Sequence, residues 1–171
     1  MGARLLPRNL PELFSYALAL EREAAKGFAE LECFLRKCGV KQLADEFQKI
    51  GREEKEQYEL LNLGTFGSDL PELAGWELSW HFIGEEVQLY RAPRSTREAV
   101  AMALVFERRA LAFYNDVAEH ARDKAVRAFA AEMANDEQRH VALLELLLER
   151  ESDATTIEPK GSETGDGLPV G

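Results

Sequence analysis

A glutamate and a histidine stand three residues apart at the start of a leucine-rich run, in the segment DEQRHVALLELLL at residues 136–148. Glu137 and His140 would share one face of a helix, because residues three apart are neighbours on a helix surface. If that face is buried, both side chains are costly to bury unless a partner neutralises them. A carboxylate and an imidazole placed together are suitable ligands for a transition-metal ion.

Four stretches of the chain show the same interruption of an apolar stripe by an acid. The glutamates concerned are Glu21, Glu54, Glu107 and Glu137. Each lies among residues that recur at helical spacing, so each is predicted to point inward. Counted from expected turns at Gly39 and Arg122, the members of each pair lie at depths that agree to within about one helical turn. The sequence therefore predicts four carboxylates that converge on one layer.

Such a layer requires positive charge. Four ionised carboxylates in a dry core would cost more than a domain's whole stability, typically about 5–15 kcal/mol, unless cations offset them. Two divalent cations carry the matching charge. A single inward glutamate is more often protonated, paired with arginine or turned to water. Four at one level, together with His140, favour a dinuclear metal site.

Helices must position these acids. Apolar residues recur with the helical period in four long segments, and almost nothing alternates with the period of a strand, so the predicted fold class is all-α. The predicted helices are about Leu10–Lys37 with Asn9 as N-cap, about Lys41–Asn62, a third from the capping box of Ser95 and Glu98 to about Ala121, and a fourth from the N-cap Asp123 to about Arg150.

The connection between the second and third helices spans residues 63–94 and is rich in tryptophan, phenylalanine and leucine. We expect a packed crossover with short helical pieces, in which Trp76 and Trp80 cover the bundle and His81 is structural. Such a connection can run back along a helix, so the second and third helices would point the same way. Two hairpins joined by a long crossover form a ferritin-like four-helix bundle. The halves also resemble each other, which suggests duplication of a hairpin.

Length, charge and cysteine content narrow the function classes. The chain has 171 residues, a mass of 19.2 kDa and a net charge of −10. We expect one domain over residues 1–150 and a disordered acidic tail over residues 151–171. The charge argues against nucleic acid and anionic membranes as partners, and no apolar run is long enough for a membrane span. Cys33 and Cys38 are expected to be reduced thiols in a cytoplasmic protein.

The arrangement resembles the di-iron carboxylate proteins of the ferritin-like group, and most closely the rubrerythrin-type domain, over residues 10–150. The resemblance is carried by Glu21, by Glu54 in EEKEQ, by Glu107 with Tyr114 in FERRALAFY, and by Glu137 with His140 in DEQRH. It implies two iron ions, with zinc or manganese as alternatives. It also implies that Glu54 and Glu107 bridge the metals, that Glu21 and Glu137 are terminal ligands, and that His140 supplies a nitrogen. Asp136 resembles the outer acid that orients a ligating imidazole across the bundle.

Three departures from the family pattern bear on chemistry. Gln57 stands where the family has a second histidine, and its amide oxygen binds iron more weakly, so one metal position is expected to be weak, differently occupied or sometimes empty. Ala110 stands where many rubrerythrins carry an additional glutamate, which puts the family's metal-shift chemistry in doubt. The chain also lacks a rubredoxin-like pair of CxxC motifs, so electrons would come from a separate donor.

The resemblance implies redox chemistry on hydrogen peroxide or dioxygen, as a peroxide reductase or a ferroxidase, in a homodimer. The alternative is a non-enzymatic metal-binding or iron-storage protein with a degenerate site. The C-terminal GDGLPVG loosely resembles the peptides that load ferritin-like cargo into encapsulin shells, which makes such a shell a candidate partner.

Other residues have weaker predicted roles. Tyr114 could be a hydrogen-bond donor, a radical site or an ordinary core tyrosine. His120 is expected to be structural, at a helix C-terminus. Glu53 and Glu56 fall off the buried stripe and are predicted to be solvated. A small apolar cavity for the oxidant would be lined by Ala24, Phe28, Ala110 and Leu111.

Overall fold

The computed structural model describes residues 6–73, 92–151 and 156–161, and within them the chain forms four long helices. The helices are α1 (Leu10–Lys37), α2 (Lys41–Gly64), α4 (Thr96–His120) and α5 (Lys124–Arg150). The predicted all-α class is confirmed. The predicted bounds agree closely, except that α2 continues two residues past Asn62 and α4 ends at His120.

Side-chain caps explain why the helix starts were predictable. The side chains of Asn9, Ser95 and Asp123 each accept hydrogen bonds from backbone N–H groups of the first helical turn. These bonds satisfy donors that a helix start leaves without an intrahelical partner. The capping box at α4 differs in one detail: the Glu98 carboxylate accepts from the backbone N–H of Arg94 at 2.6 Å. The Glu98 side chain thus caps the backbone just before the helix start.

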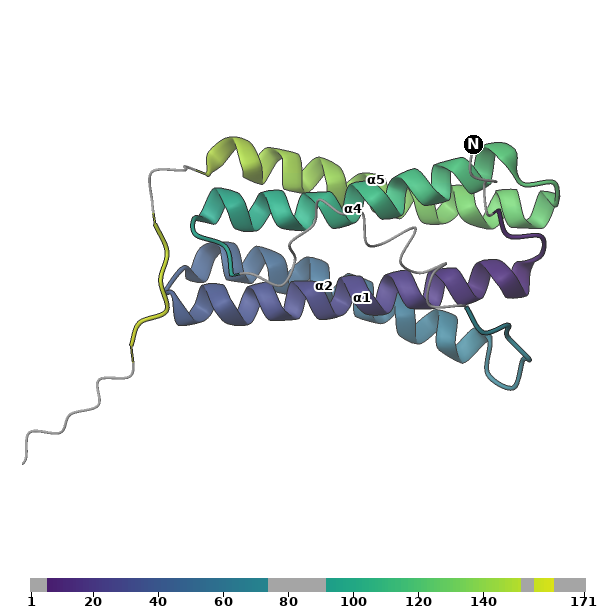
Figure 1. Ribbon diagram of the computed structural model, residues 1–171, viewed down its shortest axis with the longest axis horizontal. Coiled ribbons are helices and arrows are strands. Elements are labelled where there is room, and N and C mark those ends of the chain that lie inside the picture. The colour runs from purple at the N-terminus through teal and green to yellow at the C-terminus, as the bar shows by residue number, and fades with distance from the viewer. Residues whose placement is uncertain (1–5, 74–91, 152–155, 162–171) are drawn as a thin grey trace, which may run out of the picture.

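Neighbouring helices pair as two antiparallel hairpins, α1 with α2 and α4 with α5 (Figure 1). The first hairpin turns at Gly39, whose φ of 79° is a conformation that glycine adopts without strain. Its helices also come close at Gly51, where an added Cβ would lie 3.0 Å from Cβ of Phe28. The short turn at Gly39 and the close approach at Gly51 together place α2 alongside the C-terminal half of α1.

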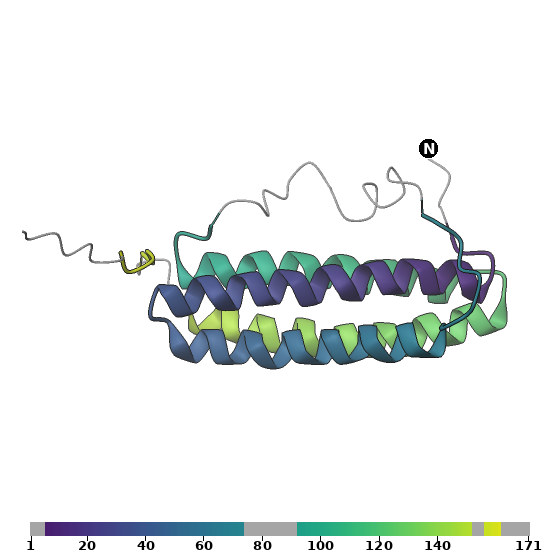
Figure 2. The same cartoon turned by 90° about the horizontal axis from the view of Figure 1, so that it is seen from below.

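The two hairpins are arranged so that α2 and α4 run in the same direction, as both views show (Figures 1 and 2). This is the connectivity of a ferritin-like four-helix bundle, as predicted. Residues 74–91, which include Trp76, Trp80 and His81, lie outside the described residues. The predicted helical pieces of the crossover therefore stay a prediction.

The apolar core consists of two clusters with the acid layer between them. Along α1, the buried apolar residues between 13 and 20 belong to one cluster and those between 28 and 35 to the other, with Glu21 at the boundary. The buried apolar residues of α4 divide in the same way on the two sides of Glu107, and those of α5 divide on the two sides of Glu137. A polar layer is thus closed off by apolar packing above and below it.

Part of the C-terminal segment lies against the end of the bundle. Ile157 is 6% exposed and belongs to the cluster at the α1–α2 turn. Its N–H donates to the carbonyl of Arg94 at 3.0 Å, and the N–H of Lys160 donates to the carbonyl of Lys37 at 3.0 Å. One buried isoleucine and two backbone hydrogen bonds therefore connect residues 156–161 to the bundle, and the expected disorder of the tail stays a prediction. Residues 152–155 and 162–171 lie outside the described residues.

Candidate metal centre

The acid layer contains the four glutamates that the apolar stripes predicted, one from each helix. The exposed fractions are 2% for Glu21, 1% for Glu54, 1% for Glu107 and 3% for Glu137. His140, one turn beyond Glu137 on α5, is 6% exposed. The prediction that these side chains are buried is confirmed.

Three of the glutamates and His140 come together closely. One potential ligand atom from each of Glu54, Glu107, Glu137 and His140 lies within 4.8 Å of every other. Nδ1 of His140 is 2.6 Å from Oε1 of Glu54 and 3.4 Å from Oε2 of Glu107. The imidazole therefore points into the carboxylate layer, and the four groups are placed as the ligands of one metal ion would be.

Several atoms of this group are buried without a hydrogen-bond partner. They are both carboxylate oxygens of Glu54, one oxygen each of Glu107 and Glu137, and Nδ1 of His140. The short contacts of Nδ1 lack the alignment of hydrogen bonds. Buried polar atoms are nearly always hydrogen-bonded, so five exceptions in one place require an explanation. A cation coordinated by these atoms would satisfy all of them, and a carboxylate-rich set with one imidazole suits iron, manganese or zinc.

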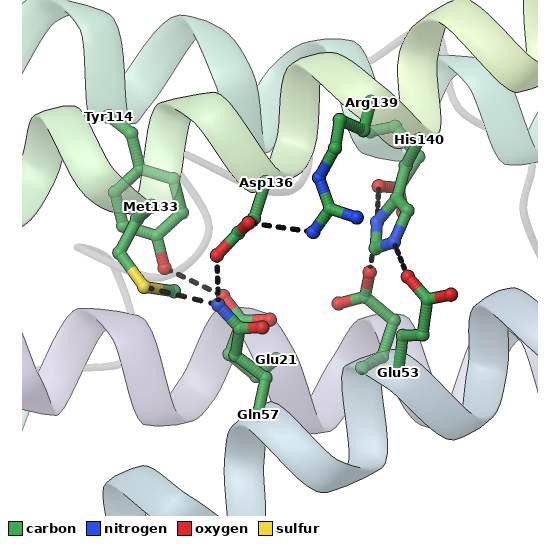
Figure 3. A network of polar contacts seen from close by, with 10 residues as sticks. Glu21, Glu53, Gln57, Tyr114, Met133, Asp136, Arg139 and His140 are labelled. Atoms are coloured by element: carbon green, nitrogen blue, oxygen red, sulfur yellow. Dashed lines mark hydrogen bonds and ion pairs between the residues drawn. The ribbon is translucent and has the colours of Figure 1, made fainter.

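Glu21 lies at the edge of this group and has a partner of its own. The hydroxyl of Tyr114 donates to Oε1 of Glu21 at 2.8 Å (Figure 3), and Tyr114 is fully buried. Burial raises the pKa of Glu21 well above its usual range, and the neighbouring Glu54 carboxylate raises it further. Of the roles predicted for Tyr114, the structure supports the hydrogen-bond donor; the radical site stays a prediction.

Glu53 is the residue that sequence reasoning missed. Half of its side chain is exposed, as predicted, but its Oε2 lies 2.9 Å from Nε2 of His140 (Figure 3). Burial lowers the pKa of His140, but the carboxylates of Glu107, Glu54 and Glu53 outweigh it and raise the pKa to about 11. Glu53 holds the outer nitrogen of the imidazole, which leaves Nδ1 turned toward the buried acids.

Asp136 makes a contact that differs from the predicted one. Its Oδ2 accepts from Nε2 of Gln57 at 2.9 Å, and its Oδ1 accepts from Arg139 at 2.7 Å. Burial raises the pKa of Asp136, but these two hydrogen bonds outweigh it and the pKa falls below its usual range. The predicted partner was a ligating imidazole across the bundle. The partner is instead an amide, because this chain has glutamine there.

Two further acids of the layer, Glu137 and Glu107, have raised pKa values. Burial raises the pKa of Glu137 well above its usual range, and the carboxylates of Glu107 and Glu54 add to the effect. Burial also raises the pKa of Glu107, although His140 lowers it in part. These side chains favour protons when no metal is bound, so protons and metal ions compete for the same atoms.

The predicted apolar lining residues fall on both sides of the layer. Phe28 belongs to the cluster at the α1–α2 turn, Ala110 belongs to the opposite cluster, and Leu111 packs against both. Ala24 is half-buried. The cavity itself stays a prediction. His120 lies at the end of α4 with Nδ1 3.1 Å from the carbonyl oxygen of Asp116, a structural position as expected.

Comparison with known proteins supports the fold more than the function. No protein-family model and no curated protein matches the sequence. A crystal structure of an uncharacterized conserved protein from Magnetospirillum magnetotacticum MS-1 is similar, with a TM-score of 0.74 and 25% sequence identity. The match covers 86% of this chain and 98% of that chain.

None of the helices in the described residues is both long and apolar enough to cross a lipid bilayer.

Together with the solved relative, the helix connectivity and the buried group of Glu54, Glu107, Glu137 and His140 identify a ferritin-like four-helix bundle with a site that could hold a metal ion.

Proposed function

We propose that this chain is a ferritin-like di-iron protein that carries out redox chemistry on hydrogen peroxide or dioxygen, as a peroxide reductase or a ferroxidase. The observation that carries the proposal is the set of five buried oxygen and nitrogen atoms without hydrogen-bond partners, on Glu54, Glu107, Glu137 and His140. Such atoms are stable in a core when a cation binds them. Bound iron would supply the electron transfers that protein side chains cannot.

In this proposal the two ions are held by Glu21, Glu54, Gln57, Glu107, Glu137 and His140. Following the family resemblance, Glu54 and Glu107 would be shared between the two ions. Zinc or manganese could occupy the same donors. The apolar clusters on both sides of the layer keep water away, which strengthens the electrostatic attraction between the acids and the metals.

Three other residues form hydrogen bonds that orient the side chains of the proposed ligands. Glu53 fixes the ring of His140 through Nε2, and Tyr114 fixes the carboxyl group of Glu21 through its hydroxyl. Asp136 fixes the amide of Gln57. Contacts of this kind typically account for about 10- to 100-fold in metal affinity or activity. Tyr114 also holds a proton at its hydroxyl, and it is our candidate for moving that proton to and from Glu21.

The partners of the reaction follow from the same resemblance. We propose a separate electron donor, since the chain has only Cys33 and Cys38 and both are free thiols. We also propose a homodimer in the cytoplasm. Encapsulation in a shell would depend on residues 165–171, which lie outside the described residues.

Metal content after aerobic purification tests the proposal. We expect about two irons per chain and an absorption band of an oxo-bridged pair. Rapid oxidation of added Fe(II) would identify a ferroxidase, and reduction of peroxide with an artificial electron donor would identify a peroxidase. A protein that takes up no metal on reconstitution with Fe(II) under anaerobic conditions would refute the proposal.

A second candidate function is a non-enzymatic metal-binding or iron-storage protein. The observation that favours it is Gln57, whose amide replaces the second imidazole and is tied to Asp136. A neutral amide is a weak iron ligand, so one position could remain unfilled. About one ion per chain, without turnover of peroxide or Fe(II), would support this alternative.

A further inference from the structure

Two acid–side-chain contacts with the same layout connect the two hairpins across the bundle, and we call each of them a brace. Glu53 of α2 contacts Nε2 of His140 on α5 at 2.9 Å, and Asp136 of α5 contacts Nε2 of Gln57 on α2 at 2.9 Å. In each case the acid immediately precedes an inward glutamate, and its partner is the residue three positions beyond the other inward glutamate. Figure 3 shows the two braces side by side. Gln57 therefore occupies the position equivalent to His140.

The contacts of Gln57 determine which of its atoms is left for a ligand. One N–H of the amide donates to Oδ2 of Asp136 at 2.9 Å, and Nε2 also lies 3.5 Å from Sδ of Met133. A carboxylate and a thioether can accept but not donate, so the nitrogen must be the atom that faces them. Within the described residues, no donor contacts the amide oxygen. By equivalence with His140, that oxygen corresponds to Nδ1, the atom that points into the acid layer.

We infer that Gln57 is a metal-selectivity residue, which presents its amide oxygen to the second metal position and makes that position all-oxygen. The inference rests on the proposed function. The position beside His140 has three carboxylates and a nitrogen within 4.8 Å of one another, and it binds Fe(II) first. The position beside Glu21 and Gln57 binds second, and it accepts Mn(II) nearly as well as Fe(II).

Ligand chemistry is the reason for this difference. Fe(II) binds more tightly than Mn(II) to sites of nitrogen and oxygen, and imidazole increases that preference, whereas carboxylate and carbonyl oxygens suit Mn(II). We therefore expect the preference for Fe(II) over Mn(II) to be at least about tenfold larger at the first position than at the second. With equal amounts of both metals, Fe(II) would fill the first position, and Fe(II) and Mn(II) would share the second.

Anaerobic titration of the metal-free full chain tests the inference. Fe(II) and Mn(II) are titrated separately and then together, binding is followed by calorimetry, and bound Mn(II) is followed by its electron paramagnetic resonance signal. We expect two separate steps for each metal, and in competition we expect Fe(II) at the first position while both metals share the second. In the variant Gln57→His, the second Fe(II) step should tighten at least about tenfold. In competition, Fe(II) should then displace Mn(II) from the second position.

Two matched variants test the braces themselves. In Asp136→Asn, the new amide N–H can donate to the oxygen of Gln57 and turn it outward, so the second step should weaken by about 10- to 100-fold while the first changes little. In Glu53→Gln, the support of His140 is altered instead, so the first step should weaken and the second should change little. Opposite effects of the two variants would support the assignment of one brace to each position.

The possible failures are distinguishable. If the wild-type chain binds neither Fe(II) nor Mn(II), the proposed function is wrong and the inference falls with it. If the two binding steps of the wild type are unchanged in Gln57→His and Asp136→Asn, only the inference is overturned. A single step with either metal would also overturn the inference, because no second position would then exist, and it would favour the non-enzymatic alternative.

Discussion

The ligand segments of α2 and α5 have the same layout but different chemistry. In α2 the segment reads EEKEQ, with Glu53, Glu54 and Gln57 at its key positions, and in α5 the corresponding segment reads DEQRH. Both place an inward glutamate second and a brace partner last, and both braces measure 2.9 Å. Among the three key positions, only the last differs in kind, amide against imidazole. In the proposed site, the two metal positions would therefore have similar geometry but unequal ligands.

A second difference between the two hairpins concerns an aromatic residue on α1 and its counterpart on α4. Tyr114, seven residues beyond Glu107, donates to Glu21 of the other hairpin. The equivalent residue seven positions beyond Glu21 is Phe28, which has no hydroxyl and instead packs edge-on against Phe47 at 5.6 Å between ring centroids. Glu21 therefore has a neutral donor that Glu107 does not have from this direction. Both departures from symmetry distinguish the position of Glu21 and Gln57 from that of Glu137 and His140.

Removing an inward glutamate from either segment should have the largest effect. In Glu54→Ala and Glu137→Ala, we expect Fe(II) affinity to fall by more than about 100-fold, because even outer partners of metal ligands account for about 10- to 100-fold. Because Glu54 is proposed to be shared by both ions and Glu137 to be a terminal ligand, Glu54→Ala should weaken both binding steps and Glu137→Ala mainly one. Iron content per chain and anaerobic titration measure the effect.

Exposed glutamates provide the controls for these variants. Glu56 lies two residues beyond Glu54 on α2, and Glu132 lies on α5; both are exposed. We expect Glu56→Ala and Glu132→Ala to bind as much iron as the wild type. Unchanged iron stoichiometry in Glu137→Ala would contradict the assignment of Glu137 as a ligand.

A change of pH should separate the metal-free from the metal-bound protein. The pKa values of Glu21, Glu107, Glu137 and His140 are raised in the folded, metal-free chain. The folded state therefore binds more protons than the unfolded state, and its free energy of unfolding decreases as pH rises through these values. Between about pH 6 and 9, where surface carboxylates are ionised in both states, we expect the melting temperature of the metal-free chain to fall.

Metal should reverse that trend. Because metal ions replace the protons, apparent affinity should rise by up to about tenfold per pH unit for each proton displaced. The difference in melting temperature between metal-bound and metal-free protein should then increase from pH 6 to pH 9. A constant difference over this range would show that the buried acids do not exchange protons for metal.

The helices and the buried acids could be predicted because local sequence determines them. Asn9, Ser95 and Asp123 cap helices with bonds to backbone only a few residues away. An inward glutamate is recognisable because its neighbours at helical spacing are apolar. Glu21 and Glu54 thus reveal their burial without any knowledge of the other hairpin.

Contacts between hairpins could not be predicted in the same way. Glu53 lies off the apolar stripe and is half exposed, so local pattern correctly indicates a solvated residue, but its long side chain reaches His140 across the bundle. The alignment of EEKEQ with DEQRH was the available signal, because it equates Glu53 with Asp136. Ile157 is a similar case, a single apolar residue in a polar segment whose burial depends on the end of the bundle.

Removing the hydroxyl of Tyr114 should have a moderate effect. In Tyr114→Phe, Glu21 loses its buried donor, which we expect to lower the free energy of unfolding of the metal-free chain by about 1–2 kcal/mol. If Glu21 belongs to the second metal position, that step should weaken and the first should not. Denaturant unfolding and Fe(II) titration measure the two effects. Equal weakening of both steps would mean that Glu21 serves both positions.

The reciprocal change, Phe28→Tyr, should have the smallest effect and offers the closest test of the symmetry. If the hairpins are equivalent in geometry, the new hydroxyl would lie opposite Glu107 as that of Tyr114 lies opposite Glu21, and it would find a carboxylate acceptor. The free energy of unfolding should then stay within about 1 kcal/mol of the wild-type value, because the new bond offsets the burial of the hydroxyl. If the hydroxyl finds no acceptor, its burial should cost about 1–3 kcal/mol. Such a loss would mean that the α1 side of the layer lacks the room that the α4 side provides, and that the difference between the two metal positions extends to the helix packing itself.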